Sequence, residues 1–471
     1  MFSLKYLPVG FLVALTLCNR AKAQKIAYNN NEAQLWLTDP DRGILFREEP
    51  VKEAIGLSNL PQITINPAKK YQVMDGFGFA LTGGSAMLIN KMSPGKQMVL
   101  LHELFGAGKN DIGASYLRIS IGSSDLDDHA FSYDDLPAGE KDPELTKFSL
   151  AEDEKALIPV LKKILAINPK IKILGSPWSA PAWMKTNDST RGGHLKPEYY
   201  HAYAQYFIKY IKGMASHGIH IDAVTIQNEP LNADNNPAMV MEANEQDVFL
   251  KNNLGPEFKA AKIRTKIILY DHNADRPDYP ISILNDPKAS VYADGSAFHL
   301  YGGKIEALSE VHKAHPDKNL YFTEQWVGAP GDLKKEMQFH IKEIIIGATR
   351  NWCKNVIEWN LAADPHQQPH TPGGCSECLG AVTIDGDQVT RNPAYYIVAH
   401  AAKFVKPGSK RIESNYLADL PNVAFVTPVG HIVLIVYNDS LVTHQFVIKS
   451  AGKSFLGMLN PGATGTFVFK N

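Results

Sequence analysis

The sequence predicts an α/β fold: a (β/α)8 TIM barrel with an attached β-sandwich built from both chain ends. Eight short apolar runs alternate with helical patterns through the middle of the chain, which is typical of a barrel. Polar or aromatic side chains stand at the C-terminal ends of these runs, where barrel enzymes place their chemistry. Beyond about residue 410 the apolar runs follow one another without helices, which indicates a sandwich.

The strand candidates are rich in β-branched and aromatic residues, as strands prefer. In chain order they span 72–81, 114–122, 171–178, 222–229, 265–273, 295–302, 320–326 and 355–362. Helical patterns lie between most of them. One is expected to begin at a capping box from Ser149 to Glu152, and others cover 197–218 and 334–352. Together these elements predict a catalytic barrel over 65–408.

Both ends of the chain are predicted to join one sandwich. Short β runs separated by turn residues fill 409–471. The segment 24–64 carries two further strand-like runs ahead of the first barrel strand. We expect this sandwich to serve as a packing domain, with carbohydrate binding as the alternative.

Residues 1–23 have the pattern of a secretory signal peptide. A lysine precedes an apolar run over 7–18, and positions 21–23 have the small-x-small form that signal peptidase cleaves. The alternative is a lipid anchor at Cys18, which the large leucine before it disfavours. No other apolar run is long enough to span a bilayer. We therefore expect export, to the periplasm or the extracellular space.

Charge and cysteine content narrow the partners. The net charge of −1 provides no single-sign field, so neither nucleic acid nor an anionic membrane is expected as a partner. Cys375 and Cys378 lie close enough in sequence for a local disulfide, with free thiols as the alternative. A zinc site would need a second pair of ligands at suitable spacing, and the sequence offers none. No metal is expected.

Two glutamates stand at the ends of predicted strands. Glu229 ends the fourth strand run and Glu324 lies near the end of the seventh. Retaining glycosidases use two carboxyl groups about 5–5.5 Å apart, one as acid/base and one as nucleophile. Adjacent mouths of strands four and seven would supply that spacing, with Glu229 as the acid/base and Glu324 as the nucleophile. The alternative for Glu229 alone is a carboxylate in a turn at a helix N-terminus.

Other strand ends also carry polar or aromatic side chains. Asn228 is expected to bond the sugar 2-hydroxyl beside the acid. Arg118 either lowers the pKa of Glu324 by its charge or forms a structural ion pair. Tyr301 is a candidate hydrogen-bond donor to the nucleophile. The remaining strand-end residues are Asp125, Trp178, Asp271, His299 and Trp359. The two tryptophans suit the walls of a sugar subsite or the barrel core, and the histidine has a structural alternative.

Seven sequence motifs occur in the same order as in a known protein family. The runs "GFGFALTGGSA", "YLRISIGSSD", "GSPWSAPAWMKTN", "AVTIQNEP", "FHLYGG", "YFTEQW" and "EWNLA" resemble glycoside hydrolase family 30 over about residues 70–408. The pattern is similar to its glucosylceramidase and endo-β-1,6-glucanase branches. The resemblance implies a TIM barrel with a flanking sandwich, a carbohydrate or glycolipid substrate, and no cofactor or metal. It also implies catalytic roles for Glu229 and Glu324, and a sugar subsite lined by Arg118, Trp178, Asn228, Tyr301 and Trp359.

One departure from the glucosylceramidase pattern concerns Gly83. Those enzymes carry an aspartate here that the resemblance implies binds hydroxyls on the far side of the glucose. A glycine is expected to remove that contact and leave space at O6, which favours β-1,6-linked glucan. The predicted activity is therefore a secreted retaining β-glycosidase acting on β-1,6-glucan. Glucosylceramidase is the alternative, followed by β-xylosidase, β-fucosidase and a non-catalytic sugar-binding protein.

Overall fold

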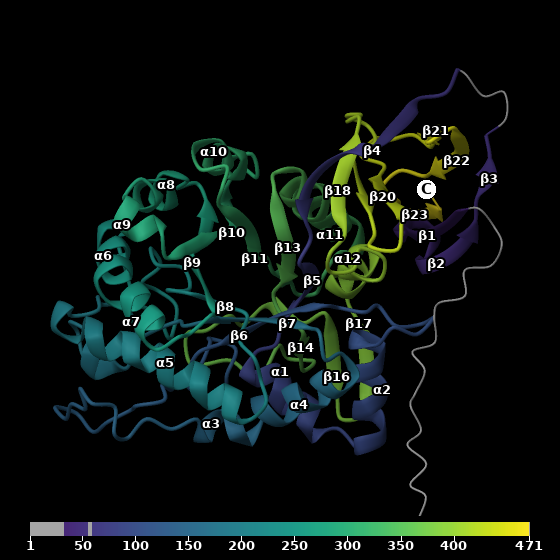
Figure 1. The fold of residues 1–471 in the computed structure, drawn as a ribbon. Helices are drawn as coiled ribbons and strands as arrows, with labels where there is room; N and C mark the ends of the chain where they lie inside the picture. The colour runs from purple at the N-terminus through teal and green to yellow at the C-terminus, as the bar shows by residue number, and fades with distance from the viewer. Residues whose placement is uncertain (1–32, 55–58, 471) are drawn as a thin grey trace, which may run out of the picture.

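The computed structural model describes residues 33–54 and 59–470. The predicted signal peptide and Cys18 lie outside these residues. Eight parallel strands close into a barrel and a ten-stranded sheet stands beside it (Figure 1), so the predicted fold class is confirmed. The barrel strands are β5 (Gly76–Ala80), β6 (Tyr116–Ser120), β7 (Lys172–Ser176), β8 (Ala223–Thr225), β9 (Lys266–Ala274), β10 (Ala293–Gly303), β11 (Asn319–Glu324) and β13 (Cys353–Glu358).

Each predicted strand coincides with one barrel strand. The strands pair in chain order, and β13 closes the barrel by pairing in parallel with β5. Side chains from seven of the eight strands, one from each, form a separate apolar cluster of the kind that fills a barrel interior. It consists of Tyr116, Leu174, Ala223, Ile268, Ala297, Tyr321 and Ile357. Since all strands are parallel, their carboxyl ends share one face of the barrel, and the predicted strand-end residues meet there.

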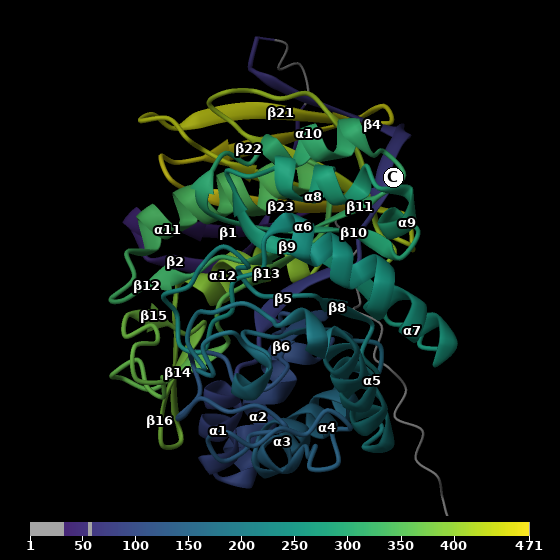
Figure 2. The same ribbon diagram turned by 90° about the vertical axis from the view of Figure 1, so that its left-hand side faces the viewer.

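Helices cover the outside of the barrel (Figures 1 and 2). The α-helices are α1 (Gly83–Lys91), α2 (Pro94–Phe105), α3 (Ala151–Lys155), α4 (Leu157–Ile167), α5 (Tyr200–Ser216), α6 (Ala243–Phe249), α7 (Gly255–Ala260), α8 (Asp278–Leu284), α9 (Pro287–Ser290), α10 (Ala307–Ala314), α11 (Leu333–Phe339) and α12 (Pro393–Ala402). Single turns of 3-10 helix are η1 (Pro40–Arg42), η2 (Ala182–Met184) and η3 (Pro197–Tyr199), and π-helical segments are η4 (Leu250–Leu254) and η5 (His340–Ala348). None of the helices in the described part of the chain has the length and apolar character needed to cross a membrane.

The predicted capping box is wrong. The Ser149 hydroxyl accepts from the amide of Ala151, two residues on, and the Glu152 carboxylate binds Lys155 instead of the backbone. The helix is also divided into α3 and α4 at Ala156, whose backbone (φ −136°, ψ −57°) departs from helical geometry. The Ser149 side chain therefore forms a local ST turn, in place of the predicted pair of capping hydrogen bonds. The helices expected over 197–218 and 334–352 are present as η3 with α5 and as α11 with η5.

The ten-stranded sheet combines both parts of the chain. Its order is β2-β1-β23-β20-β19-β18-β4-β21-β22-β3. The N-terminal strands are β1 (Ala33–Asp39), β2 (Ile44–Pro50), β3 (Lys52–Glu53) and β4 (Gln62–Val73), and β4 continues through the predicted boundary at 64/65. The C-terminal strands are β18 (Lys410–Ser414), β19 (Asn422–Val426), β20 (His431–Tyr437), β21 (His444–Ser450), β22 (Lys453–Leu459) and β23 (Thr464–Lys470).

The N-terminal strands lie inside this sheet as well as at its edge. β1 pairs with β23, and Figure 2 shows the two side by side, while β4 lies between β18 and β21. Apolar side chains from both parts, including Ile63, Phe446 and Phe467, form one buried cluster. β2, β3 and β22 were not predicted.

Two small sheets lie in the loops that follow the last barrel strands. They are formed by β12 (Val327–Gly328) with β15 (Cys378–Leu379), and by β14 (Ala362–Ala363), β16 (Val382–Asp385) and β17 (Gln388–Arg391).

Candidate active site

A pocket of about 530 Å³ opens at the carboxyl ends of the barrel strands. Five of the predicted site residues line it: Trp178, Glu229, Tyr301, Glu324 and Trp359. The other two, Arg118 and Asn228, are buried beneath it and bind each other. All seven predicted site residues therefore meet in one place.

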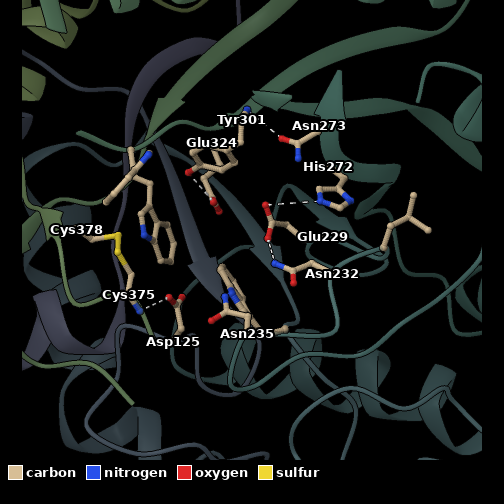
Figure 3. Close-up of a pocket in the computed structure, with 14 residues that line it drawn as sticks. Asp125, Glu229, Asn232, Asn235, His272, Asn273, Tyr301, Glu324, Cys375 and Cys378 are labelled. Carbon is tan, nitrogen blue, oxygen red and sulfur yellow. Dashed lines mark hydrogen bonds and ion pairs between the residues drawn. A yellow bond between two sulfur atoms is a disulfide. The ribbon is translucent and has the colours of Figure 1, made fainter. Parts of the chain in front are cut away.

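The two predicted carboxylates face each other across the pocket (Figure 3). Glu229 follows β8 and has a positive φ of 45°, a conformation that non-glycine residues rarely adopt. Glu324 ends β11. A carboxylate oxygen of each and a ring nitrogen of His299 lie within 4.8 Å of one another. The expectation that the strands are adjacent is wrong, because β9 and β10 separate β8 from β11 and His299 comes from β10.

Arg118 links four buried partners. Its guanidinium donates to Glu324 at 2.6 Å, to Asp271 at 2.8 Å, to Asn228 at 2.6 Å and to the Ser176 hydroxyl at 3.1 Å. The side chain is fully inaccessible to solvent. Although burial opposes the charge, the two carboxylates raise the pKa of Arg118. Arg118 therefore holds the network beneath the pocket. It forms a structural ion pair with Asp271, and its charge also acts to lower the pKa of Glu324, so both roles considered from the sequence apply.

Glu324 is bound on both of its oxygens. Arg118 donates to Oε2, and the Tyr301 hydroxyl donates to Oε1 at 3.0 Å. Burial raises the pKa of Glu324, while the charges of His299 and Arg118 oppose that rise. Two donors on one carboxylate fix its orientation and favour its charged form.

Glu229 shares a hydrogen bond with His299. The His299 Nδ1 lies 3.2 Å from Glu229 Oε1, and its Nε2 lies 3.2 Å from Asp271. Burial disfavours the charged ring, but Glu324, Asp271 and Glu229 raise the pKa of His299 to about 9. In turn, although burial opposes it, His299 lowers the pKa of Glu229 to about 2. These opposite shifts in pKa favour a charged imidazole paired with a charged carboxylate across this hydrogen bond.

Trp178 and Trp359 form the inner wall of the pocket. Their rings stack with centroids 5.3 Å apart, and both side chains are buried. The Arg118 guanidinium lies 4.8 Å from the Trp178 ring centre. Both alternatives from the sequence apply, since the rings line the pocket and also pack in an apolar cluster.

A disulfide continues this wall, since Cys378 packs in the same apolar cluster as the two tryptophans. Cys375 and Cys378 are bonded and both line the pocket, which settles the choice between disulfide and thiols. The Cys375 amide donates to the Asp125 carboxylate at 3.1 Å, and the Thr371 amide donates to the Asp125 carbonyl at 2.8 Å. Burial raises the pKa of Asp125 to about 7. The disulfide loop thus fixes a carboxyl group at the pocket.

Several lining residues were not predicted as site residues. They are Leu231, Asn232, Asn235, His272, Asn273 and Trp326. Asn232 donates to Glu229 Oε2 at 2.7 Å. His272 follows Asp271 at the end of β9, and Trp326 follows Glu324 by two positions. The alternation of strand side chains would have placed Trp326 on the same face as Glu324.

The expectation that Gly83 leaves space for the sugar is wrong. Gly83 does not line the pocket, and a Cβ at this position would overlap the carboxylate of Asp127. That carboxylate is buried in a separate cavity, where Ser124 donates to it from its amide and its hydroxyl. The aspartate that lines the active-site pocket beside Glu229 and Glu324 is Asp125 instead. Gly83 therefore carries no information about the O6 position or about xylosides and fucosides.

The buried Asp127 predicts a pH-dependent stability. Burial raises the pKa of Asp127 to about 7, above its ordinary value of 3.8. An acid whose folded pKa is raised makes the protein less stable as pH rises from the unfolded to the folded value. Asp127→Asn is therefore expected to raise the melting temperature more at about pH 8 than at about pH 4. Thermal unfolding at both values checks this, with the exposed Asp128→Asn as the control. An equal shift at both pH values would contradict it.

One group of side chains among the described residues has the spacing of a metal site. It consists of Glu229, His299 and Glu324, the same three groups that meet in the pocket.

Comparison with known proteins identifies the family. Residues 74–405 match the glycosyl hydrolase family 30 TIM-barrel domain, and residues 408–467 match the family 30 beta sandwich domain. An endo-1,6-beta-D-glucanase of Trichoderma harzianum is 34% identical over 424 residues, which cover 84% of each chain. The lysosomal acid glucosylceramidase of Mus musculus is 29% identical over 429 residues, 85% of this chain and 81% of the relative.

A solved structure agrees with these relatives. The structure of an endo-beta1,6-glucanase superposes with a TM-score of 0.87 and 36% identity, covering 93% of this chain and 100% of that one. The similarity extends over both the barrel and the sandwich. This chain is therefore a glycosyl hydrolase and belongs to glycosyl hydrolase family 30.

Proposed function

We propose that the protein is a retaining β-glycosidase that cleaves internal bonds of β-1,6-linked glucan, with Glu324 as nucleophile and Glu229 as acid/base. The observation that carries the mechanism is the spacing of these two groups, whose oxygens lie within 4.8 Å. Retaining enzymes place their carboxyl groups about 5–5.5 Å apart, whereas inverting enzymes leave about 6.5–9.5 Å for a water molecule. The short separation supports double displacement.

In the first step Glu324 attacks the anomeric carbon while Glu229 protonates the departing oxygen. Arg118 and Tyr301 hold the two oxygens of Glu324, so the attacking carboxylate needs no reorientation. The proton for the leaving group comes through the hydrogen bond between His299 and Glu229. The proton moves from the imidazole of His299 to Glu229 more easily when less negative charge surrounds the ring. Attack of Glu324 on the substrate neutralises the charge of that carboxylate and so favours this transfer. In the second step Glu229 takes a proton from water while the water oxygen attacks the anomeric carbon and breaks its bond to Glu324. The proton on Glu229 then returns to His299 through the same hydrogen bond, which restores the starting state.

The remaining predicted residues hold the sugar. Arg118 binds the carbonyl oxygen of Asn228, so the amide NH2 group is the end available to the 2-hydroxyl. Trp178 and Trp359 supply a flat apolar wall for one face of the ring. Asp125, fixed by the disulfide loop, is a further hydroxyl partner on the same side.

The substrate follows from the relatives rather than from Gly83. Endo-1,6-beta-glucanases are 34–36% identical to this chain, against 29% for the mouse glucosylceramidase. The solved endo-beta1,6-glucanase also covers nearly the whole described chain. β-1,6-Glucan is therefore the preferred substrate.

The test is product analysis of the mature protein on β-1,6-glucan and, separately, on glucosylceramide. Short β-1,6 oligosaccharides, with the lipid left intact, are the expected result. A Glu324→Gln protein from the same preparation controls for contaminating glycosidases. Release of glucose and ceramide, with the glucan untouched, would assign the glucosylceramidase activity instead.

We also propose that the protein acts after export. The signal-like pattern of residues 1–23 supports this, and so does the disulfide, which oxidising compartments preserve.

A further inference from the structure

The half-buried Trp326 is an aromatic lining residue that the proposed mechanism does not use. It follows Glu324 by two positions, so both side chains reach the pocket from the same strand end. Unlike the buried Trp178 and Trp359, its side chain is partly exposed. An aromatic ring that is partly open to solvent at a sugar site has a free face for a ligand.

The indole ring of Trp326 is fixed by contacts on the side that faces away from the pocket. The Trp326 backbone bridges in parallel to Trp359, and β12, which follows Trp326 directly, pairs with β15 of the disulfide loop. A Cβ at Gly328 would stand 3.4 Å from the indole, so the ring lies close against the backbone of β12. It also packs on the apolar cluster that contains Trp178, Trp359 and Cys378. The indole is therefore preorganised, and its position depends on the disulfide loop.

Its place in the pocket indicates which sugar unit it meets. Figure 3 shows Cys375, Cys378 and Asp125 on the side of the pocket opposite Glu229 and Asn232. Since Trp326 packs on the cluster that contains Cys378, it belongs to the disulfide side. The acid stands beside the leaving group, so the leaving sugar departs on the Glu229 side. The non-reducing part of the substrate then extends toward the disulfide side.

We propose that Trp326 is the stacking platform for the glucose unit attached to O6 of the unit being cleaved, and so a residue that determines preference for β-1,6 chains. This inference rests on the proposed function, whose site it extends by one sugar. In this proposal the glucose unit being cleaved occupies the space between Glu229, Glu324 and the inner tryptophans. Only a substrate with a second, β-1,6-linked unit on its non-reducing side reaches the indole.

The experiment compares nitrophenyl β-gentiobioside with nitrophenyl β-glucoside, which differ only by that second unit. The readout is the ratio of the two kcat/KM values for nitrophenol release. Trp326→Ala is expected to lower this ratio about tenfold or more, the loss typical when a buried aromatic contact is truncated. Trp326→Phe keeps a ring and should keep most of the ratio. Tyr416→Ala removes an exposed aromatic side chain far from the pocket and serves as the matched control.

The outcomes separate this inference from the proposed function. If the wild-type protein degrades β-1,6-glucan and Trp326→Ala keeps the wild-type ratio, the platform is refuted and the glucanase function stands. Equal kcat/KM values for the two substrates in the wild-type protein would also refute the platform, since no second unit is then bound. If the wild-type protein leaves β-1,6-glucan intact, both proposals fail.

Discussion

Glu324→Gln is expected to lower kcat for glycoside hydrolysis by about 10⁴-fold or more, the scale seen when a catalytic nucleophile is removed. Glutamine has nearly the same shape, so it can still meet Arg118 and Tyr301, but its amide cannot form the glycosyl ester. The loss should therefore appear in kcat for every substrate, including those with good leaving groups. Initial rates on nitrophenyl β-glucoside check this directly.

Azide rescue tests the division of roles between the two glutamates. In a Glu324→Gly protein, azide takes the place of the missing nucleophile and inverts the anomeric carbon, so the product should be the α-glucosyl azide. In Glu229→Ala, the glycosyl enzyme still forms with a good leaving group, and azide then attacks it to give the β-glucosyl azide. The opposite pair of products would exchange the assigned roles. Rescue of neither variant would contradict double displacement.

Replacing Arg118 with methionine is expected to cost about 3–5 kcal/mol of unfolding free energy, because it leaves buried carboxylates without their partner. Arg118 donates to Glu324 and Asp271, and all three side chains are nearly or fully inaccessible. Hydrolysis should also be lost, since the nucleophile loses one of its two donors. Urea unfolding measures the first effect.

The pH dependence identifies the cause of that loss. Although burial opposes it, Arg118 and His299 hold the pKa of Asp271 well below its usual range. In the Arg118→Met protein the guanidinium no longer opposes the effect of burial, so the pKa values of Asp271 and Glu324 are expected to rise. These carboxyl groups then take up protons as the pH falls from about 7 to about 4, which removes the uncompensated buried charge. The Arg118→Met defect should therefore be larger at about pH 7 than at about pH 4.

Arg350 provides a matched control. It is half-buried, and its hydrogen bonds go to Ser414 and to the carbonyl of Asn422, which carry no charge. Arg350→Met should destabilise the protein to a similar degree at both pH values. A defect of Arg118→Met that is independent of pH would show that packing, and not charge compensation, is what Arg118 supplies.

The barrel and most of the site could be predicted from the sequence, because both depend on the local pattern of apolar and polar residues. A parallel strand buried on both faces reads as an apolar run, and its carboxyl end is marked by the first polar residue after it. Glu229 and Glu324 could be found in this way without knowing which strands are neighbours. Their true relation, across the barrel mouth with His299 between them, depends on the closed order of the sheet.

Other features depend on contacts that the sequence order hides. Gly83 and Asp127 are far apart in the chain pattern, so nothing local indicates that a carboxylate fills the space in front of the glycine. The hydrogen bond between Cys375 and Asp125 joins the loop after the last barrel strand to the loop after the second. No local sequence pattern predicts this contact either. β22 escaped notice because glycine and serine interrupt its apolar residues. Trp326, in contrast, was predictable from strand alternation alone.

The place of β4 in the sheet has a consequence for synthesis. This strand lies between β18 and β21, which are made several hundred residues later, and it leads directly into the first barrel strand. Until the last segment leaves the ribosome, β1 and β4 have open edges that can pair with other chains. The sandwich therefore forms only after the whole chain exists. Residues 408–467, although matched as a separate unit, lack the four N-terminal strands β1 to β4 that complete their sheet.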